Sequence, residues 1–391
     1  MSIPEPLPID IEVEDKPIIK VLGVGGGGCN AVNYMYKLGI HGVTFIVCNT
    51  DKQSLGTSLV PKKLQLGVEG LGAGGKPEVS KKHAEDSIEV IKQALDDGTK
   101  MVFITAGMGG GTGTGAAPVV ARVAKDMGIL TVGIVTIPFS FEGPKRIENA
   151  MVGVKNMADS VDALLVINND TLTEDDYGDL DIKEAFGKAD NVLAQAAKSI
   201  AEIITKPGYI NIDFADVESA LKNGRVAIMN VGEAEGENRV INALNNALNS
   251  PLANNVDISG ASRILMQITC KGMKGSELQQ ITKFKEEIGG GHIEVSMGLS
   301  FDDDMGDKIN IILIATGYEL EQLPGFIPTN DEEITKATQA AYSHHIETKT
   351  NFRPSQTDNP KTSAIIDLYD DVDKDDVEET PTWMRENIIV E

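Results

Sequence analysis

A glycine-rich turn that follows an apolar segment is the feature that most constrains the fold of this chain. Residues 104–115 read ITAGMGGGTGTG, and the apolar run at 101–105 that leads into them predicts a β-strand. Turns of this kind bind phosphate, because their backbone amides point at the anion and the helix that follows has a positive N-terminus. A P-loop would carry a lysine after its last glycine, but Ala116 stands there. The sequence therefore predicts a phosphate site in which backbone amides and a helix start, near residues 113–117, supply the positive field.

The chain around this turn alternates between short β-branched runs and helical stretches. That alternation predicts βαβ units around a mostly parallel sheet, and hence an α/β, Rossmann-like nucleotide-binding domain over residues 17–180. In open α/β sheets ligands bind at the carboxyl ends of the strands, and each expected strand ends in a polar or glycine-rich loop. The expected strands are residues 18–24, 43–50, 100–106, 130–137 and 163–169.

A long central helix is expected next, and a smaller domain after it. Apolar residues recur at three- and four-residue steps, which predicts one amphipathic helix at residues 181–205 that Pro207 and Gly208 end. The pattern then changes to a smaller α+β domain, within residues 206–322. Its expected elements are strands at 262–270, 292–300 and 308–318 and a helix at 276–288.

The two ends of the chain have compositions typical of disordered segments. Residues 1–16 are acidic and proline-rich, and residues 323–379 combine low hydrophobicity with a run of acidic residues. Such segments bury too little apolar surface to offset the entropy of ordering. The segment from Thr380 to Glu391 differs, since it places Trp383 among other apolar residues. An apolar cluster after a disordered linker predicts a peptide that docks on a partner.

Charge and composition exclude several classes of function. The chain has 35 basic and 59 acidic residues, so its formal net charge of −24 would repel nucleic acid and anionic membrane surfaces. It has neither a signal peptide nor an apolar run of about 18 residues, so we expect a cytoplasmic protein with no direct membrane insertion. Its cysteines lack C-x-x-C spacing and its histidines lack an H-x-x-x-H pattern. We therefore expect neither a disulfide framework nor a metal site made of side chains.

Another glycine cluster, VLGVGGGGCNA, precedes the opening one in the chain. Gly23, Gly25 and Gly28 match G-x-G-x-x-G after a predicted strand, and Asp51 stands near the spacing at which a dinucleotide fold keeps its ribose-binding acid. Taken alone, this pattern favours an NAD-dependent oxidoreductase. A dinucleotide fold has one glycine-rich phosphate turn, however, whereas this chain has two on neighbouring strand ends. Two turns predict a polyphosphate held from two sides.

The candidate phosphate ligands come from both turns. Their backbone amides can approach the anion closely because glycine has no side chain, and two threonine hydroxyls add further donors. The residues expected around the phosphates are Gly25, Gly26, Gly27, Gly28, Gly109, Gly110, Gly111, Thr112, Gly113, Thr114 and Gly115.

The segment NIDFADV carries two aspartates three residues apart. If a helix begins near Asp213, the carboxylates of Asp213 and Asp216 share its N-terminal face, where the macrodipole tolerates negative charge. The residues alone favour a helix cap with an acid at its third position. A catalytic pair is the alternative that they leave open.

Taken together, these motifs resemble the tubulin superfamily, and within it the FtsZ family of bacterial cell-division GTPases. The resemblance rests on GVGGGGCNA, NTDKQSL, GLGAGGKPEV, AGMGGGTGTG, PFSFEGPKR and NIDFADV, and runs from about Ile18 to Tyr318. It implies GTP or GDP as the nucleotide, with Mg²⁺ bridging the β- and γ-phosphate oxygens. It also implies a peptide tail, from Thr380 to Glu391, that docks on membrane-anchoring adaptor proteins.

The resemblance also implies roles for individual residues. Those implied near the terminal phosphate are Ala73, Gly74 and Gly75. Glu142 and Arg146 are implied to contact the ribose, and Asn30 to lie near the sugar or the base. The base pocket is implied to contain Asn169, Phe186 and Asp190, where a carboxylate can accept hydrogen bonds from both guanine N1–H and the N2 amino group. The loop implied to complete the active site of the neighbouring subunit contains Asn211, Asp213 and Asp216.

The function that follows is a polymerisation-dependent GTPase. The resemblance implies a cytoskeletal protein that assembles head-to-tail into filaments, which form the division ring at mid-cell. Assembly would complete the hydrolytic site, and hydrolysis would weaken the contact between subunits. Two alternatives stay open at this point: an NAD-dependent oxidoreductase with a Rossmann fold, and a tubulin-like scaffold that binds nucleotide without polymerising.

Overall fold

A computed structural model describes residues 17–172, 181–205, 208–249, 258–289 and 293–323, all within one compact unit. The expected N-terminal extension, linker and docking peptide lie outside these ranges, apart from Leu323. Inside these ranges, no helix is both long enough and apolar enough to cross a membrane.

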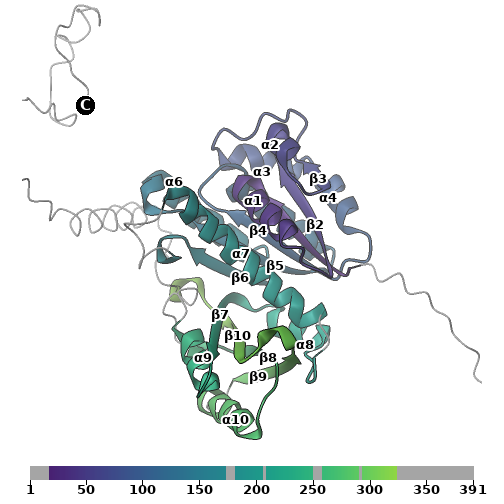
Figure 1. The fold of residues 1–391 in the computed structure, drawn as a ribbon. Helices are drawn as coiled ribbons and strands as arrows, with labels where there is room; N and C mark the ends of the chain where they lie inside the picture. The colour runs from purple at the N-terminus through teal and green to yellow at the C-terminus, as the bar shows by residue number, and fades with distance from the viewer. Residues whose placement is uncertain (1–16, 173–180, 206–207, 250–257, 290–292, 324–391) are drawn as a thin grey trace, which may run out of the picture. The chain divides into compact units, whose positions relative to one another are not determined.

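A single sheet of ten strands organises the described chain, in the order β3–β2–β1–β4–β5–β6–β7–β10–β8–β9 (Figure 1). Every neighbouring pair from β3 to β7 is parallel, as the alternating sequence pattern predicts. The sequence pattern misses β3, because its KKLQ sequence has one buried residue and no apolar run. The strands of the N-terminal half are β1 (Ile19–Val24), β2 (Val43–Asn49), β3 (Lys62–Gln65), β4 (Met101–Gly107), β5 (Leu130–Ile137) and β6 (Ala163–Asn168).

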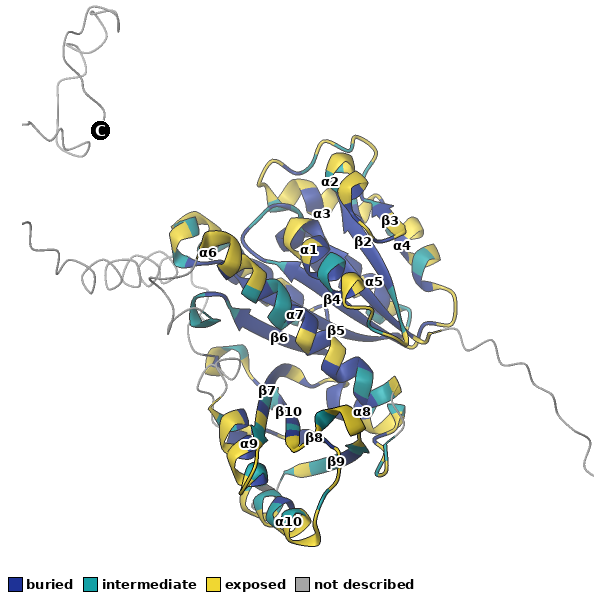
Figure 2. Cartoon of the chain, viewed as in Figure 1, coloured by how far each residue is buried: buried dark blue, intermediate teal, exposed yellow. Residues whose placement is uncertain are grey.

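Helices cover both faces of the N-terminal half. Its central strands are consequently buried along almost their whole length, as the dark blue of β4 and β5 shows in Figure 2. Alternate residues of β1 enter two separate cores: Leu22 packs with α3 to α6, whereas Val21 packs with α1 and α7. The helices of this half are α1 (Gly25–Lys37), α2 (Lys52–Thr57), α3 (Pro77–Glu85), α4 (Ile88–Leu95), α5 (Thr112–Asp126) and α6 (Pro144–Ala158).

The long helix expected at 181–205 is α7 (Ile182–Thr205), which lies across the sheet (Figure 1). Its first turns lie at the carboxyl ends of the strands, where the Phe186 ring centroid is 5.2 Å from that of Phe139, two residues beyond β5. Its last residue lies at the amino ends of the strands, because a β-carbon on Gly42, just before β2, would stand 2.7 Å from Thr205. The helix therefore spans the sheet, with about 28 Å between Phe186 and Thr205 at 1.5 Å per residue.

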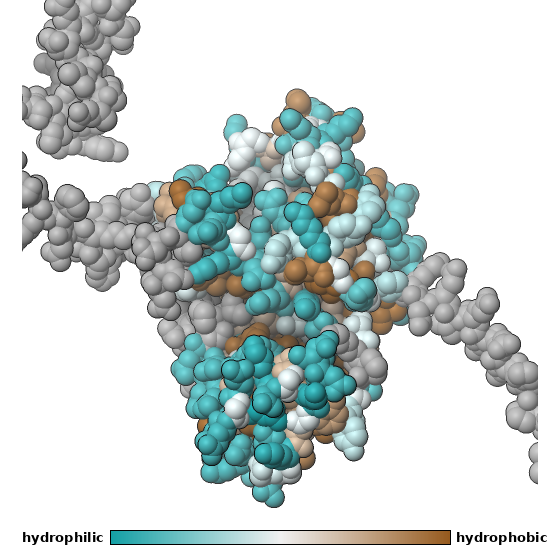
Figure 3. All heavy atoms as spheres, in the orientation of Figure 1, coloured by the Kyte–Doolittle hydropathy of each residue, from teal (hydrophilic) through white to brown (hydrophobic). Residues whose placement is uncertain are grey.

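The C-terminal half extends the same sheet with mixed strands, and its described residues include the α-helices α8, α9 and α10. Antiparallel pairing joins β7 to β10 and β10 to β8, while β8 and the edge strand β9 are parallel. Figure 3 shows mostly hydrophilic residues on the visible face of the molecule over α9 and α10. The elements are α8 (Phe214–Leu221), β7 (Arg225–Glu235), α9 (Arg239–Leu248), β8 (Arg263–Cys270), α10 (Gly275–Gly289), β9 (Glu294–Phe301) and β10 (Lys308–Tyr318).

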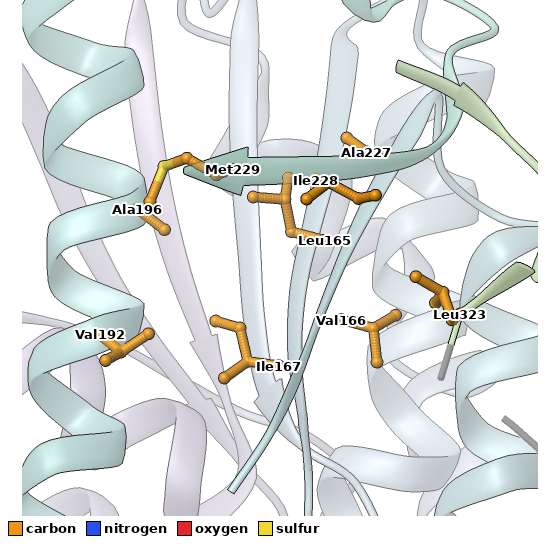
Figure 4. Close-up of a pocket in the computed structure, with 9 residues that line it drawn as sticks. All are labelled: Leu165, Val166, Ile167, Val192, Ala196, Ala227, Ile228, Met229 and Leu323. Atoms are coloured by element: carbon orange, nitrogen blue, oxygen red, sulfur yellow. The ribbon is translucent and has the colours of Figure 1, made fainter. Parts of the chain in front are cut away.

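The two halves meet where β6 and β7 pair, and this pairing is short. Only Ala163, Leu164 and Leu165 of β6 have partners in β7, after which the strands separate. A small apolar cavity opens at the separation, lined by β6, β7, α7 and Leu323 (Figure 4). The expected fold class, a parallel-sheet domain joined by a long helix to a smaller α+β domain, is confirmed. The sequence did not indicate that the two halves would also share a sheet.

Candidate functional site

The first glycine segment (residues 23–28) and the second (residues 107–115) lie against each other at the carboxyl ends of β1 and β4. A β-carbon on Gly25 would stand 2.7 Å from the backbone nitrogen of Gly113, and one on Gly28 would stand 2.2 Å from the carbonyl oxygen of Thr105. Gly25 also has φ +74°, a conformation that favours glycine. Only glycine lets the starts of α1 and α5 approach this closely, so two helix N-termini, each a favourable place for an anion, lie side by side.

The threonines of the second glycine segment are bonded to protein. Thr114 is buried, and its hydroxyl accepts the backbone N–H of Gly109 at 2.9 Å. The hydroxyl of Thr112 lies 2.8 Å from that of Thr50, at the end of β2. Because α5 begins at Thr112, slightly before the expected start, these contacts brace the loop at the helix N-terminus. Thr114 thus has a structural role that the sequence did not predict.

The loop with Ala73, Gly74 and Gly75 adjoins the second glycine segment. A β-carbon on Gly111 would stand 3.0 Å from Ala73 Cβ and 3.2 Å from the Gly75 carbonyl carbon. Gly74 and Gly75 are exposed and have positive φ, so their backbone can face a ligand without side chains in the way. Three segments distant in sequence therefore surround the same space.

Asp51 holds this loop through local structure. Its carboxylate caps α2 by accepting the backbone N–H groups of Gln53 at 2.8 Å and Ser54 at 3.3 Å, and Asp51 forms an isolated β-bridge with Leu71. The dinucleotide pattern predicted a ribose-binding acid at this position. In the structure the Asp51 carboxylate is already engaged as a helix cap.

The residues expected near the sugar lie around the start of α6 and on α1. Glu142 and Arg146 form an ion pair, and Glu142 Oε1 also accepts the backbone N–H of Phe139 at 3.1 Å. The start of α6 reaches the second glycine segment, since a β-carbon on Gly109 would stand 2.7 Å from the Arg146 carbonyl oxygen. Asn30 is exposed on α1, beyond the first glycine segment.

The residues expected around the base include one buried acceptor without a partner and one half-buried carboxylate. Asn169 follows β6 and is buried, yet its Oδ1 has no hydrogen-bond partner. Asp190 lies one turn after Phe186 on α7, and burial raises the pKa of its carboxyl group to about 6. A buried acceptor without a partner costs free energy, so such groups in a native structure call for a ligand or a water molecule.

The acidic loop (residues 211–216) is separate from all of these segments. Asp213 caps α8 and Asp216 stands at its third position: Asp216 N–H donates to Asp213 Oδ1 at 2.8 Å, and Asp213 N–H to Asp216 Oδ2 at 3.2 Å. Both side chains are exposed, while the Asn211 side chain accepts the Gly208 N–H. The cap that the residues alone favoured is therefore present, and exposure leaves lone pairs on both carboxylates.

The acidic loop lies near the amino ends of the central parallel strands, whereas the glycine segments lie at the carboxyl ends. It follows the far end of α7, and the chain after α8 enters the sheet where Arg225 N–H donates to the Asp162 carbonyl oxygen, just before β6 begins. Helix α8 is about 12 Å long, so Asp213 lies within roughly that distance of the amino end of β6. The aspartates therefore cannot reach the phosphate loops of their own chain.

Some residues that shape the site were missed by the sequence reasoning. Phe139 and Phe141 flank Ser140 in the PFSFEGPKR motif and pack with Phe186, and Asp170 binds Ser140. The motif drew attention only to its charged residues, although two aromatic residues two apart after a strand were a visible signal. Among the described residues, no group of three or more His, Cys, Asp and Glu side chains could hold a metal ion.

Two protein families match the chain. Residues 18–175 match the GTPase domain of the Tubulin/FtsZ family, and residues 225–319 match the C-terminal domain of the FtsZ family. A cell division protein FtsZ from Porphyromonas gingivalis is 44% identical over 95% of this chain and 86% of its own length. One from Buchnera aphidicola is 44% identical over 80% of this chain and 82% of its own length.

Solved structures agree with this similarity. An empty FtsZ dimer from M. jannaschii superposes with a TM-score of 0.70 at 39% identity, covering 77% of this chain and 88% of that one. A GTPγS-bound protofilament of CetZ2 from Haloferax volcanii has a TM-score of 0.66 at 20% identity, over 85% of this chain and 99% of that one, so it supports the fold alone.

Proposed function

Because this chain belongs to the FtsZ family, and is therefore a tubulin-like cell-division GTPase, we propose that it hydrolyses GTP at a site shared by two subunits. The glycine segments of one subunit would hold the nucleotide, and the acidic loop of the next subunit would supply the catalytic carboxylates. Family membership also decides against an NAD-dependent oxidoreductase.

The single observation that carries the shared site is the separation within one chain. The phosphate loops follow the carboxyl ends of β1 and β4, whereas Asp213 and Asp216 lie beyond the far end of α7, which spans about 28 Å between Phe186 and Thr205. A head-to-tail contact would bring the acidic loop of one copy to the nucleotide of the next. A heterologous contact of this kind generates filaments when its rotation does not close into a ring.

The phosphates would be held by backbone amides and two helix N-termini. These groups are fixed before the substrate arrives, so stabilising the charge on the γ-phosphate needs little reorganisation. Gly74 and Gly75 would bring further amides to the terminal phosphate. Thr112 and Thr114 would mainly support the loop, because their hydroxyls contact Thr50 and Gly109.

The base pocket would select guanine through its acceptors. The Asp190 carboxylate can accept from N1–H and from the N2 amino group of guanine, and adenine offers no such donor pair. Asn169 Oδ1, which is buried without a hydrogen-bond partner, would be a further acceptor for the base. A nucleotide that lacks these donors would leave buried acceptors unpaired, which is how polar sites reject the wrong ligand.

The chemical step would be attack by water on the γ-phosphate. Asp213 and Asp216 are exposed on the acidic loop and would orient and polarise that water, while Asn211 shapes the loop through its bond to Gly208. Mg²⁺ would be held mainly by the phosphates and water, as is usual for this ion, and would neutralise charge on the phosphate oxygens. We expect product GDP to weaken the contact between subunits.

In the cell, the filaments would form the division ring at mid-cell, in the cytoplasm. The relatives are named as cell division proteins, and one solved FtsZ is a dimer, which supports self-assembly of this chain. The segment from Thr380 to Glu391 would dock on adaptor proteins at the membrane. A scaffold that binds GTP without assembling is the remaining alternative.

Mixing two inactive variants tests the shared site. Asp213→Asn should bind GTP but hydrolyse little of it, and Asp190→Ala should lose GTP binding but keep its acidic loop. In a mixture, the acidic loop of the Asp190→Ala protein can meet the nucleotide of the Asp213→Asn protein, so GTPase activity should return. An inactive mixture of two folded, co-sedimenting variants would contradict a shared site.

Dilution of the unmodified protein gives an independent measurement. Specific activity should fall steeply below the concentration at which the protein sediments with GTP, because the site then dissociates. Activity that stays constant far below this threshold would contradict a shared site, and GTP binding without any sedimentation would favour the non-assembling scaffold.

A further inference from the structure

Asp170 ties the loop after β5 to the turn after β6. Its Oδ1 and Oδ2 accept the backbone N–H of Ser140 at 3.1 and 3.2 Å, and Oδ2 also accepts the Ser140 hydroxyl. Asn168 steadies Asp170 in turn, because Asn168 Oδ1 accepts the Asp170 N–H at 3.1 Å. Ser140 is thereby held in one position relative to the end of the sheet.

Ser140 stands between two phenylalanines whose rings stack on each other. Phe139 is fully buried, and its ring lies 5.0 Å from that of Phe141, with 13° between their planes. Phe186 meets Phe139 edge-on at 5.2 Å. Fixing Ser140 therefore fixes the stacked pair, and through Phe139 its contact with α7.

The two outer rings of this cluster are free to meet a ligand. Phe141 is 50% exposed and Phe186 is 41% exposed, and their rings stand nearly perpendicular, at 89° and 6.2 Å. Asn169, with its unpaired Oδ1, directly precedes Asp170, and Asp190 lies one turn along α7 from Phe186. Exposed aromatic faces, together with an unpaired amide oxygen and a carboxylate, suit a flat heterocycle with hydrogen-bond donors on its edge.

We propose that Asp170 is a positioning residue for guanine recognition, and that Phe141 is the ring it places against the base. Asp170 acts through Ser140, and the proposal rests on the GTP site described above. Without its bond to Asp170, the loop could rotate and carry Phe141 off Phe139. The base would then have to order this loop on binding, which lowers affinity without changing the phosphate site.

Nucleotide affinity and turnover separate this role from a general structural one. In the full chain, Asp170→Ala and Phe141→Ala should each raise the Kd of a fluorescent GTP analogue by about tenfold, as expected for loss of base stacking. The kcat at saturating GTP should stay within about twofold, since neither residue touches the phosphates. The double variant should bind no more weakly than Phe141→Ala alone, because Asp170 acts through that ring.

Two further variants keep the test informative. Asp170→Asn retains an oxygen that can accept the Ser140 N–H, so it should fold even if Asp170→Ala does not. Its Kd should lie between that of the unmodified protein and that of Asp170→Ala. Asp126→Ala removes an exposed carboxylate at the end of α5 and should leave binding unchanged.

The failure of this inference is distinct from failure of the proposed function. Unchanged GTP affinity in Asp170→Ala and Asp170→Asn, or losses that simply add in the double variant, would overturn the role of Asp170. If the unmodified protein bound no GTP, the guanine site itself would be wrong.

Discussion

Gly28 lies so close to Thr105 that a β-carbon on Gly28 would stand 2.2 Å from the Thr105 carbonyl oxygen. This oxygen belongs to the backbone of β4, at the centre of the sheet, and cannot move aside without breaking strand pairing. Gly28→Ala should therefore force α1 away from β4 and lower the free energy of unfolding by at least about 1–3 kcal/mol. Urea unfolding of the nucleotide-free protein measures this loss.

Gly26→Ala is the matched control for that substitution. Gly26 lies in the same turn of α1, but a β-carbon there would have no atom within 4 Å beyond its chain neighbours and its own helix backbone, and its φ is not positive. Its unfolding free energy should be nearly unchanged, and alanine favours helix. Equal stability for both variants would show that the first glycine segment is not packed as tightly as described.

GTP binding should weaken as the pH falls through about 6. Burial raises the pKa of Asp190 to about 6, and only the ionised carboxylate accepts both guanine donors without supplying a proton of its own. The Kd for GTP, measured between pH 5 and 8, should rise toward acid with a midpoint near that pKa. Asp190→Asn should bind more weakly at pH 8 and lose this pH step, and an unaltered step in the variant would mean that another group titrates.

The same raised pKa predicts that Asp190 destabilises the nucleotide-free protein. The folded pKa of Asp190 lies above its ordinary value of 3.8, so folding disfavours the ionised form. Stability from this group is greatest below pH 3.8 and is lost as the pH rises through about 6. Asp190→Asn should therefore raise the melting temperature at pH 8 without GTP, and a lower melting temperature would contradict this. The opposite signs for stability and binding would identify a functional residue.

Much of the fold could be predicted because the parallel strands are long and apolar. Strands β4, β5 and β6 each coincide with an apolar run that contains β-branched residues. Helix α7 shows a helical repeat of apolar residues over its whole length. The sequence pattern misses β7, because asparagine, glycine and glutamate interrupt its apolar residues. Residues 225–235 form a strand because of tertiary contacts, since β6 and β10 pair with β7 on either side.

The candidate site was predictable where backbone geometry restricts the residue type, and less so elsewhere. Glycines at close contacts leave a clear signal, so both glycine segments could be found and their contact expected. The role of Thr114 as a brace and of Asp51 as a helix cap could not be foreseen, because a hydroxyl or carboxylate bonds equally well to a ligand or to nearby backbone. The aromatic cluster depends on Phe186, which joins it only through tertiary folding.

A buried lysine offers a test of folding away from the site. Lys20 is 1% exposed, and its Nζ donates to Asp97 Oδ1 at 2.7 Å and to the Ala94 carbonyl oxygen at the end of α4. Asp97→Asn should destabilise the protein by about 1–3 kcal/mol, because it leaves a buried cation without its carboxylate. Lys20→Met should cost less, since methionine fills the space without a charge; the reverse order in urea unfolding would contradict this.

The ion pair between Lys20 and Asp97 also makes the stability of the folded protein depend on pH in the acid range. Burial raises the pKa of Asp97, but hydrogen bonds from Lys20 and Thr99 outweigh it, so its pKa lies below its ordinary value of 3.8. The stability that Asp97 contributes is therefore complete above pH 3.8 and is lost as the pH falls through the lower, folded pKa.

Substitutions of Asp213 can separate its capping role from catalysis. Asparagine is as good a helix cap as aspartate, so Asp213→Asn should keep α8 and the melting temperature, whereas Asp213→Ala should cost about 1 kcal/mol. If the carboxylate polarises water in the next subunit, both variants should lose most GTPase activity while binding GTP and sedimenting normally. If Asp213 were only a cap, turnover by Asp213→Asn would equal that of the unmodified protein. Comparing kcat with melting temperature for the two variants therefore decides between the roles that the NIDFADV sequence left open.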